Sequence, residues 1–448
     1  MILLVACTPE VVEDTGLHQV PLELGPVQRC SSPVREGWEL QEPFHGGEPS
    51  ELADGGSVLV EDLDGDGFFD LIASWDQGTA LHVYTGPDWT EQELPAITPS
   101  QLSRTPFGFI TGGGRPTRYH LDLQAWDTVE GLTGGVREAL WVQGVGLVLL
   151  MDGPAGDGMD LVIGGAPLDE VANQTAFDGV VFDHDGDGDQ DLYVVNDNPL
   201  DGHNVLWHQE DGALIPTDFA ALAMSGMGVD LGDVNRDGRA DLYLTAAGEN
   251  RLLLGQEDGR FVDVTAVWGA SPIVGQGMGW GGVFWDADND GDLDLMTAEG
   301  DFTGSHSLGL GPQPLSLLRN EEDRFHHEPW AEGNFRAVVP VDLNDDGVLD
   351  LVVSRVVEGP MLFLSTGCTE AGWLRVEGPP GAKVTLLDTG QTAWISTDSG
   401  FGGARPASVH LGAGSAEWIR VAVEVEGRRS VVEVEPRRVL KVLDSEGH

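Results

Sequence analysis

The sequence is poor in basic residues, in cysteine and in tyrosine. Its 448 residues include 23 Lys and Arg, three Cys and four Tyr against 75 Asp and Glu, and its formal net charge is −52. So acidic a surface repels nucleic acids and anionic membranes, which disfavours both as partners. No stretch of the sequence approaches the ~20 apolar residues that a membrane-spanning helix needs.

Glycine and apolar residues, in contrast, are plentiful. The 63 Gly and 25 Pro suit many short strands joined by tight turns better than long helices. Apolar residues make up 41% of the chain, which indicates a folded protein, and its length allows a large core with an accessory domain.

Five nine-residue segments share the pattern D-x-[DN]-x-D-G-x-x-D, and we call them loops 1 to 5. Each offers oxygen-bearing side chains at positions 1, 3, 5 and 9. These predicted metal ligands are Asp62, Asp64, Asp66 and Asp70 in loop 1; Asp183, Asp185, Asp187 and Asp191 in loop 2; Asp233, Asn235, Asp237 and Asp241 in loop 3; Asp286, Asp288, Asp290 and Asp294 in loop 4; and Asp342, Asn344, Asp346 and Asp350 in loop 5.

This spacing has a physical purpose. Calcium takes about 6–8 oxygen ligands at ~2.3–2.6 Å, and side chains at positions 1, 3 and 5 of a tight turn converge on one point. The Gly at position 6 permits the sharp turn, the carbonyl of position 7 adds an oxygen, and the Asp at position 9 completes the shell. Without a cation, carboxylates so close together repel one another. The sequence therefore predicts about five Ca²⁺ sites.

The EF-hand begins with the same pattern but needs a bidentate Glu at loop position 12. The residues at that position are Ala73, Val194, Leu244, Thr297 and Val353. Short apolar runs rich in β-branched and aromatic residues flank each loop, which is typical of strand–loop–strand units rather than helices.

Further strands complete each repeating unit. Asp211-Gly212 and Asp258-Gly259 lie between apolar runs and indicate hairpins. Loops 2 to 5 begin 50, 53 and 56 residues apart, which is the length of a four-stranded propeller blade. The pattern predicts an all-β fold, a β-propeller.

Glycine-rich phrases precede loops 3 and 4, at residues 225–229 and 277–282. Together with the loops they resemble the FG-GAP (VCBS-type) repeat family, and in particular bacterial proteins of the cartilage-acidic-protein type. The resemblance implies an integrin-α-like propeller, which suggests seven blades. Five blades carry loops 1 to 5; a degraded copy at residues 156–163 and a segment around residues 121–127 would supply two blades without a well-formed metal site.

The same resemblance implies a C-terminal ASPIC/UnbV-like module. Its characteristic stretches correspond to residues 381–384, 399–401 and 410–414. The Trp-Pro-x-Gly-like turn that follows in the family is absent, and residues 423–427 stand in its place. We predict a signal at 1–7, a linker at 8–47, the calcium-binding propeller at 48–366 and the C-terminal β domain at 370–442.

The three cysteines carry separate expectations. Leu4-Val5-Ala6-Cys7 fits a bacterial lipobox, although a basic region before it is lacking; the alternative is an ordinary apolar N-terminus. If Cys7 is lipidated, Cys30 and Cys368 remain, before the first repeat and after the last. In a circular fold these points are neighbours, so we predict a disulfide that closes the ring, with two unpaired thiols as the alternative.

Other patterns carry less information. His203, His208 and the pair His326-His327 lack a matching ligand cluster, so we interpret them as loop histidines. Trp75, Trp89 and Trp207 are candidate sugar-stacking platforms, but packing between blades explains them better. Residues 196–204, 301–314 and an insertion at 97–148 are the least regular loops, and therefore the candidate binding loops.

These observations favour an exported calcium-binding protein that is not an enzyme. We expect a monomeric surface adhesion, binding or scaffold protein for a protein or glycan partner, secreted or held at the outer membrane or cell surface by lipid on Cys7. The alternative is a polysaccharide lyase on a calcium-stabilised propeller. A lyase needs a base and a basic cleft for an acidic sugar, and 23 Lys and Arg with four Tyr equip the chain poorly for that.

Overall fold

The computed structural model describes most of the chain. The described residues are 20–28, 38–41, 56–74, 80–85, 90–95, 102–105, 108–111, 117–120, 125–128, 135–152, 159–162, 176–197, 203–219, 222–272, 277–302, 307–356, 359–366 and 369–443. Apart from the single helical turn α1 (Thr265–Trp268), the elements are β-strands. Within the described residues no helix is long and apolar enough to cross a membrane.

Seven antiparallel groups of three or four strands form the blades of a propeller; the strands of blade 1 also continue a larger sheet of the C-terminal domain, and β2 (Trp38–Gln41) completes blade 7. Blade 1 contains β3 (Ser57–Glu61), β4 (Asp70–Ser74), β5 (Ala80–Thr85) and β6 (Thr90–Pro95); blade 2 contains β7 (Leu102–Thr105), β8 (Gly108–Thr111), β9 (Thr117–His120) and β10 (Ala125–Thr128); blade 3 contains β11 (Gly135–Val142), β12 (Gly146–Asp152) and β13 (Met159–Val162); blade 4 contains β14 (Ala176–Phe182), β15 (Asp191–Asn196), β16 (Val205–Glu210) and β17 (Ala213–Thr217); blade 5 contains β18 (Gly226–Gly232), β19 (Asp241–Ala246), β20 (Arg251–Gly255) and β21 (Phe261–Asp263); blade 6 contains β22 (Gly279–Trp285), β23 (Asp294–Glu299), β24 (Gln313–Asn320) and β25 (Phe325–Gly333); and blade 7 contains β26 (Phe335–Val341), β27 (Asp350–Arg355), β28 (Met361–Ser365) and β2 (Trp38–Gln41).

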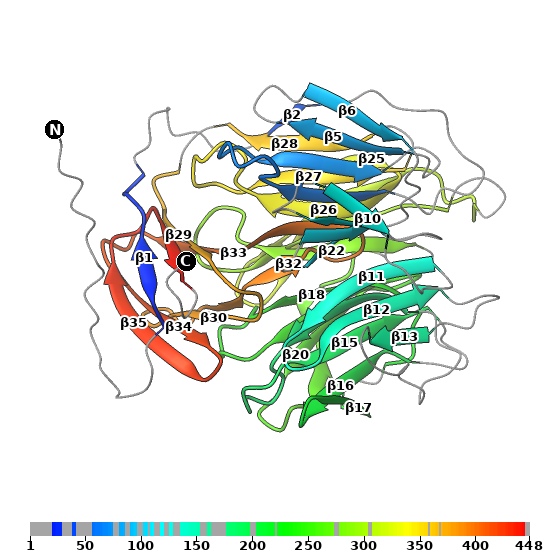
Figure 1. Ribbon diagram of the computed structural model, residues 1–448. Coiled ribbons are helices and arrows are strands. Elements are labelled where there is room, and N and C mark those ends of the chain that lie inside the picture. The colour runs from blue at the N-terminus through cyan, green and yellow to red at the C-terminus, as the bar shows by residue number, and fades with distance from the viewer. Residues whose placement is uncertain are drawn as a thin grey trace.

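The first strand of each blade lies at the centre of the ring. These inner strands contact one another in the order β3, β7, β11, β14, β18, β22 and β26, and β26 contacts β3 again, which closes the circle. Figure 1 shows the blades around one axis, with the C-terminal strands to one side. The predicted all-β, seven-bladed propeller with a small C-terminal β domain is confirmed.

The predicted linker, residues 8–47, contributes two strands. β2 (Trp38–Gln41) pairs with β28 and completes blade 7, with Trp38 opposite Ser365. β1 (Leu22–Leu24) pairs with β36 in the C-terminal domain. The N-terminal part of the chain thus joins the last blade and the C-terminal domain, because both offer an edge strand that is otherwise unpaired.

Other expectations about individual segments and residues can be compared with the structure. Residues 97–148 are not an inserted loop: they contain all of blade 2 and the first strand of blade 3. The degraded copy supplies β13 of blade 3, and the segment around residues 121–127 leads into β10 of blade 2. Trp207 is 2% exposed and packs within the hydrophobic core of blades 3 and 4, as the packing interpretation predicts.

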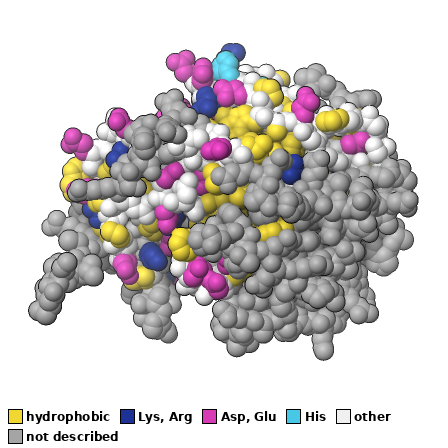
Figure 2. Space-filling view, turned by 90° about the horizontal axis from the view of Figure 1, so that it is seen from above, with side chains coloured by type: hydrophobic (Ala, Val, Ile, Leu, Met, Phe, Trp, Pro, Cys, Tyr) yellow, Lys and Arg dark blue, Asp and Glu magenta, His cyan; other side chains and the backbone are white. Residues whose placement is uncertain are grey.

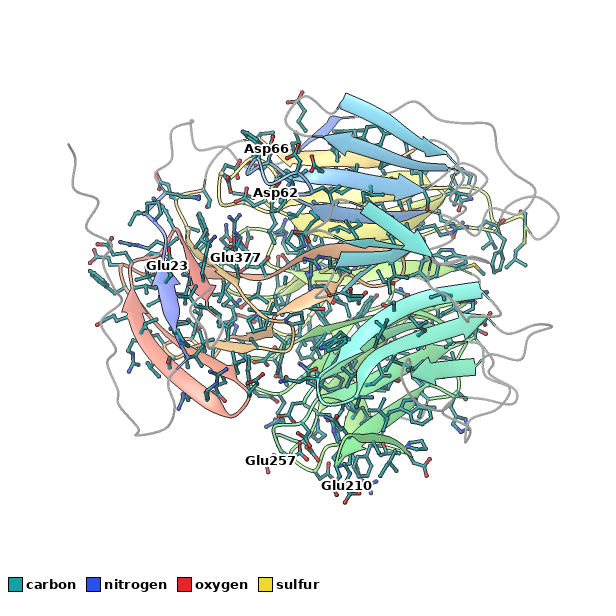
Figure 3. The ribbon with its side chains drawn as sticks, in the orientation of Figure 1. Glu23, Asp62, Asp66, Glu210, Glu257 and Glu377 are labelled. Atoms are coloured by element: carbon teal, nitrogen blue, oxygen red, sulfur yellow. The ribbon has the colours of Figure 1, made fainter. Side chains whose placement is uncertain are left out.

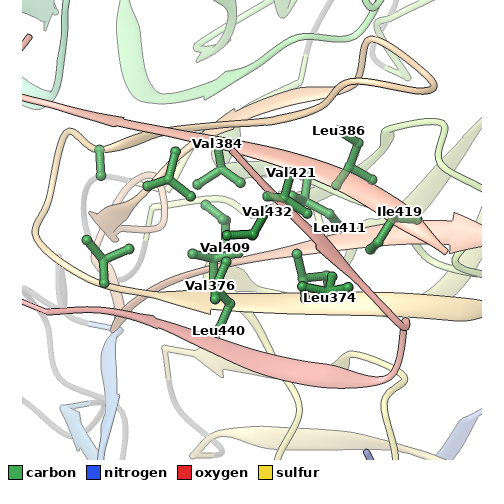
Figure 4. Packing of buried hydrophobic residues seen from close by; sticks show 14 of the residues in the cluster. Leu374, Val376, Val384, Leu386, Val409, Leu411, Ile419, Val421, Val432 and Leu440 are labelled. Carbon is green, nitrogen blue, oxygen red and sulfur yellow. The ribbon is translucent and has the colours of Figure 1, made fainter. Parts of the chain in front are cut away.

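Two facing sheets form the C-terminal domain. One contains β1, β36 (Arg438–Val442), β29 (Gly372–Glu377) and β33 (Gly403–Gly414), to which β32 (Ser396–Asp398) is paired; the other contains β31 (Thr392–Trp394), β30 (Lys383–Leu386), β34 (Ile419–Val425) and β35 (Arg428–Val434). Buried Val, Leu and Ile side chains from both sheets make a core of their own (Figure 4). This domain is also joined to the propeller, because β33 pairs in parallel with β3 of blade 1.

Residues 395–405, which we call the plug, enter the centre of the ring. Thr397 Oγ1 donates to the carbonyl of Arg104 on β7, 3.3 Å away, and Ser399 Oγ donates to the carbonyl of Val338 on β26, 2.9 Å away. The Phe401 ring lies 4.9 Å from that of Trp280 on β22 and 6.1 Å from that of Phe177 on β14. The plug thus contacts inner strands on opposite sides of the ring.

The glycine-rich phrases before loops 3 and 4 lie where the backbones approach most closely. A Cβ on Gly228 would lie 2.6 Å from the Trp280 carbonyl oxygen and 3.0 Å from the backbone nitrogen of Phe401. A Cβ on Gly281 would lie 2.5 Å from the carbonyl oxygen of Arg336 in the next blade. Glycine at these positions therefore allows the inner strands and the plug to pack together.

We expect Phe401→Ala to lower the melting temperature and the urea midpoint, because removing a buried Phe side chain costs about 3–5 kcal/mol. Phe401 is 2% exposed, whereas Phe68 is 49% exposed. The matched control Phe68→Ala should leave both midpoints nearly unchanged. Equal effects of the two substitutions would show that the plug is not packed in the ring.

Candidate metal centres

All five loops adopt the same backbone arrangement. The carboxylate at position 1 accepts a hydrogen bond from the backbone N–H of the Gly at position 6, with distances of 2.9–3.0 Å. Position 4 has a positive φ in each loop, as does the Gly at position 6. A positive φ is sterically unfavourable for residues other than glycine, yet Arg236, Asn289 and Asp345 occupy position 4 of loops 3, 4 and 5. This second left-handed position gave no signal in the sequence.

Positions 3 and 5 are also held in place by backbone donors. The side-chain oxygen of position 3 accepts from the N–H of position 5, and that of position 5 accepts from the N–H of position 7, in every loop. One carboxylate oxygen from each of positions 1, 3 and 5 lies within 4.8 Å of the others in loops 1, 2 and 4. Figure 3 shows Asp62 and Asp66 of loop 1 at the end of their blade. Loops 3 and 5 carry Asn at position 3 and keep the same hydrogen bonds.

Position 9 has a different environment. Its carboxylate accepts from the backbone N–H of position 2 in all five loops. In loops 2 to 5 its other oxygen accepts from a backbone N–H at the end of the third strand of the blade, at Gln209, Gly255, Asn320 and Ser365. Position 9 therefore ties the start of the loop to the third strand, and its role as a metal ligand stays a prediction.

A buried carboxylate in loop 4 gives evidence for cation binding that is independent of the residue spacing. Asp286, at position 1 of loop 4, is 1% exposed, and its Oδ1 atom is buried without a hydrogen-bond partner. Burial, together with the charges of Asp290, Asp294 and Asp288, raises its pKa well above the usual range. A carboxylate oxygen in that situation needs a proton or a metal ion. The acidic groups of these loops can therefore hold metal ions.

The C-terminal domain lies against loops 2 to 5. Lys383 Nζ donates to the carbonyl of Gly238 in loop 3 at 3.0 Å, and Gln190 of loop 2 donates to the carbonyl of Pro380 at 3.2 Å. His410 Nε2 lies 2.8 Å from Asn289 Oδ1 in loop 4. Arg375 Nη1 lies 3.2 Å from Asp345 Oδ1 in loop 5.

The three C-terminal stretches singled out in the sequence all contact the propeller. Residues 381–384 contain Lys383, residues 399–401 belong to the plug, and residues 410–414 face loop 4. In the last of these, a Cβ on Gly412 would lie 2.0 Å from Asp286 Oδ2, so a side chain there would displace a predicted ligand. These stretches therefore have an interdomain role that the sequence did not reveal.

His184, at position 2 of loop 2, and His208, on β16, form a pair that the sequence did not reveal, with ring centroids 5.4 Å apart. His184 Nδ1 is 2.7 Å from Asp191 Oδ2, and His208 Nδ1 is 3.1 Å from Asp191 Oδ1. Burial opposes protonation of His184, but its hydrogen bond and charge interaction with Asp191 raise its pKa. His208 is thus not an isolated loop histidine; the signal was His184 at position 2, next to the first ligand. Cys7, Cys30, Cys368, Trp75 and Trp89 lie outside the described residues.

Loop 2 allows positions 5 and 9 to be separated experimentally. We expect Asp187→Asn to weaken metal binding without lowering the melting temperature in EDTA, because Asp187 is exposed, an amide oxygen can still accept from Asp189, and the substitution removes a charge that repels Asp183. Asp191→Asn should lower stability with or without metal by about 1–3 kcal/mol, since its NH₂ group would face backbone donors. Thermal melts of both variants in EDTA and in calcium measure these changes in stability. If Asp191→Asn lowers the melting temperature only in calcium, the main role of Asp191 is metal ligation.

The metal-free protein should be more stable at mildly acidic pH. Burial raises the pKa of Asp233 to about 6, of Asp294 and Asp342 to about 7, and of Asp241 to about 8. An unfolded Asp titrates near 3.9, so between about pH 4 and pH 8 the folded state binds protons that the unfolded state does not, and stability falls as pH rises. In EDTA we expect the melting temperature to rise as the pH is lowered from about 8 to about 5, and we expect excess calcium to remove this pH dependence. A melting temperature in EDTA that falls as the pH is lowered over this range would contradict the raised pKa values of these carboxyl groups.

Comparisons with known proteins agree with this geometry. A profile of FG-GAP-like repeats matches residues 183–244 and 233–297, which contain loops 2, 3 and 4. Cartilage acidic protein 1 of Mus musculus is 28% identical over 286 residues, covering 56% of this chain and 43% of the mouse protein. Its Homo sapiens counterpart is 28% identical over 288 residues, covering 56% of this chain and 42% of the human protein. The chain thus spans less than half the length of these relatives.

Solved structures with a similar arrangement are more distant in sequence. BBS1N, in its complex with ARL6DN, is 14% identical with a TM-score of 0.46, covering 75% of this chain and 99% of that one. The WD40 domain of Toxoplasma gondii coronin is 13% identical with a TM-score of 0.45, covering 75% of this chain and 89% of that one. From the repeat match and the curated relatives, the chain contains FG-GAP-like repeats and is a distant relative of cartilage acidic protein 1.

Proposed function

We propose that this protein is an exported calcium-binding β-propeller that serves as a surface adhesion, binding or scaffold protein. The observation that carries the proposal is the uniform geometry of loops 1 to 5, in which carboxylate or amide oxygens from positions 1, 3 and 5 are held by the same backbone donors. Oxygen ligands without nitrogen or sulfur at these positions favour a hard cation such as Ca²⁺. Five ions would reduce the formal charge from −52 to about −42.

The topology supports one free face for a partner. Neighbouring strands are antiparallel, so the turns of a blade alternate between its two ends. Loops 1 to 5 join first to second strands and lie at the end that faces the C-terminal domain. The described residues of segments 196–204 and 301–314 follow the second strands and precede the third strands of blades 4 and 6, and therefore lie at the opposite end.

Segment 301–314 has features of a built binding loop. The Asp301 carboxylate accepts from the backbone N–H groups of Leu308, Gly309 and Leu310 at 2.9–3.1 Å, which ties the two ends of the segment together. Leu308 is 61% exposed. The turn at residues 307–310, held by Asp301 and presenting an apolar side chain, is suited to a protein or glycan partner.

The surface charge supports the same class of partner. Figure 2 shows acidic side chains beside a patch of hydrophobic side chains on the described part of this view, and the sequence contains 75 Asp and Glu against 23 Lys and Arg. A neutral or basic partner suits such a surface better than nucleic acid or an anionic membrane.

Export, lipid attachment and ring closure by a disulfide are parts of this proposal that rest on the sequence. Cys7 lies in the lipobox-like segment, and Cys30 and Cys368 flank the repeats. Calcium sites of moderate affinity are filled at the millimolar calcium outside cells, which is consistent with an extracytoplasmic site of action.

We expect the purified protein to hold about five calcium ions per chain and to lose thermal stability when EDTA removes them, because a metal that binds only the folded state stabilises it by mass action. Elemental analysis and thermal melts measure both. An unchanged melting temperature in EDTA, or a chain without bound calcium, would contradict the proposal.

The binding role itself is tested on a glycan array and by pull-down from the native envelope, each with and without chelator. Leu308→Asp should reduce capture, and the exposed control Val267→Asp should not. Incubation with acidic polysaccharides distinguishes the alternative: a lyase would release unsaturated sugars that absorb in the ultraviolet.

A further inference from the structure

A group of acidic side chains lies at the centre of the ring, apart from loops 1 to 5. Glu138 on β11, Asp178 on β14 and Asp398 on the plug each offer a carboxylate oxygen, and these oxygens lie within 4.8 Å of one another. Glu138 is 7% exposed and Asp178 is 2% exposed. Two blades and the C-terminal domain thus contribute one ligand atom each.

The hydrogen bonds around this group leave one oxygen without a partner. Asp178 Oδ2 accepts from the backbone N–H of Val229 on the next inner strand at 2.8 Å. Burial and the nearby charge of Asp178 raise the pKa of Glu138 well above its usual range. The second oxygen of Glu138, Oε2, is buried and has no hydrogen-bond partner.

The local charge is strongly negative. A fourth carboxylate, Asp230, is 2% exposed and acts on both Asp178 and Asp398 through its charge. Arg405 of the plug lies 3.9 Å from Asp230 through Nη2 and Oδ1. Burial raises the pKa of Asp398 well above its usual range, as do the charges of Asp178 and Asp230, and Arg405 offsets only part of this. Four carboxyl groups and one guanidinium in a buried space need a further positive charge.

We propose that Glu138, Asp178 and Asp398 bind one calcium ion in the centre of the ring and thereby join the plug to blades 3 and 4. The ligand set is carboxylate oxygen alone, which suits a hard cation. The three oxygens lie within 4.8 Å of one another, and 4.8 Å is twice a Ca–O distance of about 2.4 Å, so one calcium ion can contact all three. Glu138 Oε2 supplies the vacant acceptor.

This central ion differs from the loop ions in access to solvent. Positions 3 and 5 of loops 1 and 2 are exposed, whereas the central group is covered by the plug. The central ion should therefore exchange slowly in the folded protein. The distinction does not depend on whether the loops bind calcium.

Retention of calcium after brief chelation tests the proposal on the full-length chain. The protein is loaded with calcium, passed quickly over a chelating column and analysed for metal before and after unfolding in denaturant. We expect one equivalent of calcium to remain with the native protein and to be released on unfolding. A native protein that retains no ion would overturn the proposal and would show that the carboxyl groups share protons instead.

Isosteric variants assign the retained ion. Glu138→Gln and Asp398→Asn should each lose this equivalent, whereas Asp388→Asn, which alters an exposed carboxylate paired with Arg420 in the same domain, should keep it. Circular dichroism and elution volume confirm folding of each variant. Retention in both Glu138→Gln and Asp398→Asn would overturn the site. One retained equivalent in a chain whose loops bind no calcium would support the central site and contradict the proposed function of the loops.

Discussion

The architecture depends on backbone N–H groups that hold carboxylates together against their mutual repulsion. In each loop, four side chains accept hydrogen bonds from the turn, and the positions of their oxygens are fixed before any ion arrives. This arrangement is costly in the absence of a cation, because burial and neighbouring charges both disfavour ionisation. The same preorganisation explains why positions 1, 3, 5 and 6 are so regular in the sequence.

The features that could be predicted from the sequence each lie within one short, continuous segment. A nine-residue turn and its flanking strands lie within one short segment, so the loops, the strand–loop–strand units and the blade period could be identified from spacing alone. The contacts of Asp191 with the third strand of its blade could not be predicted in this way, because His208 and Gln209 belong to another strand. The left-handed residue at position 4 was missed for another reason: Gly, Arg, Asn and Asp all occupy it, so no residue type marks it.

The features that could not be predicted from the sequence depend on contacts between segments that are distant along the chain. The sequence predicts a linker at residues 8–47 and no strand at 38–41, because the partner strand β28 lies more than three hundred residues later and so short a segment carries no periodic signal. The central carboxylates come from three separate elements and share no motif. The C-terminal stretches were identified by resemblance, but their contacts with loops 2 to 4 and with the ring centre emerge only in three dimensions.

The pairing of β2 with β28 also sets an order of assembly. The fourth strand of blade 7 is made early in synthesis, and its partner is made only after six blades have been completed. Until then, blade 7 does not exist, and the first blade has no neighbour on that side. Such long-range pairing slows folding and leaves strand edges open while the chain is incomplete. A chain released before blade 7 is made would leave β2 without its partner strand and would expose the apolar faces of blades 6 and 1 that blade 7 covers in the complete ring. Truncated products of this protein should therefore be prone to aggregation.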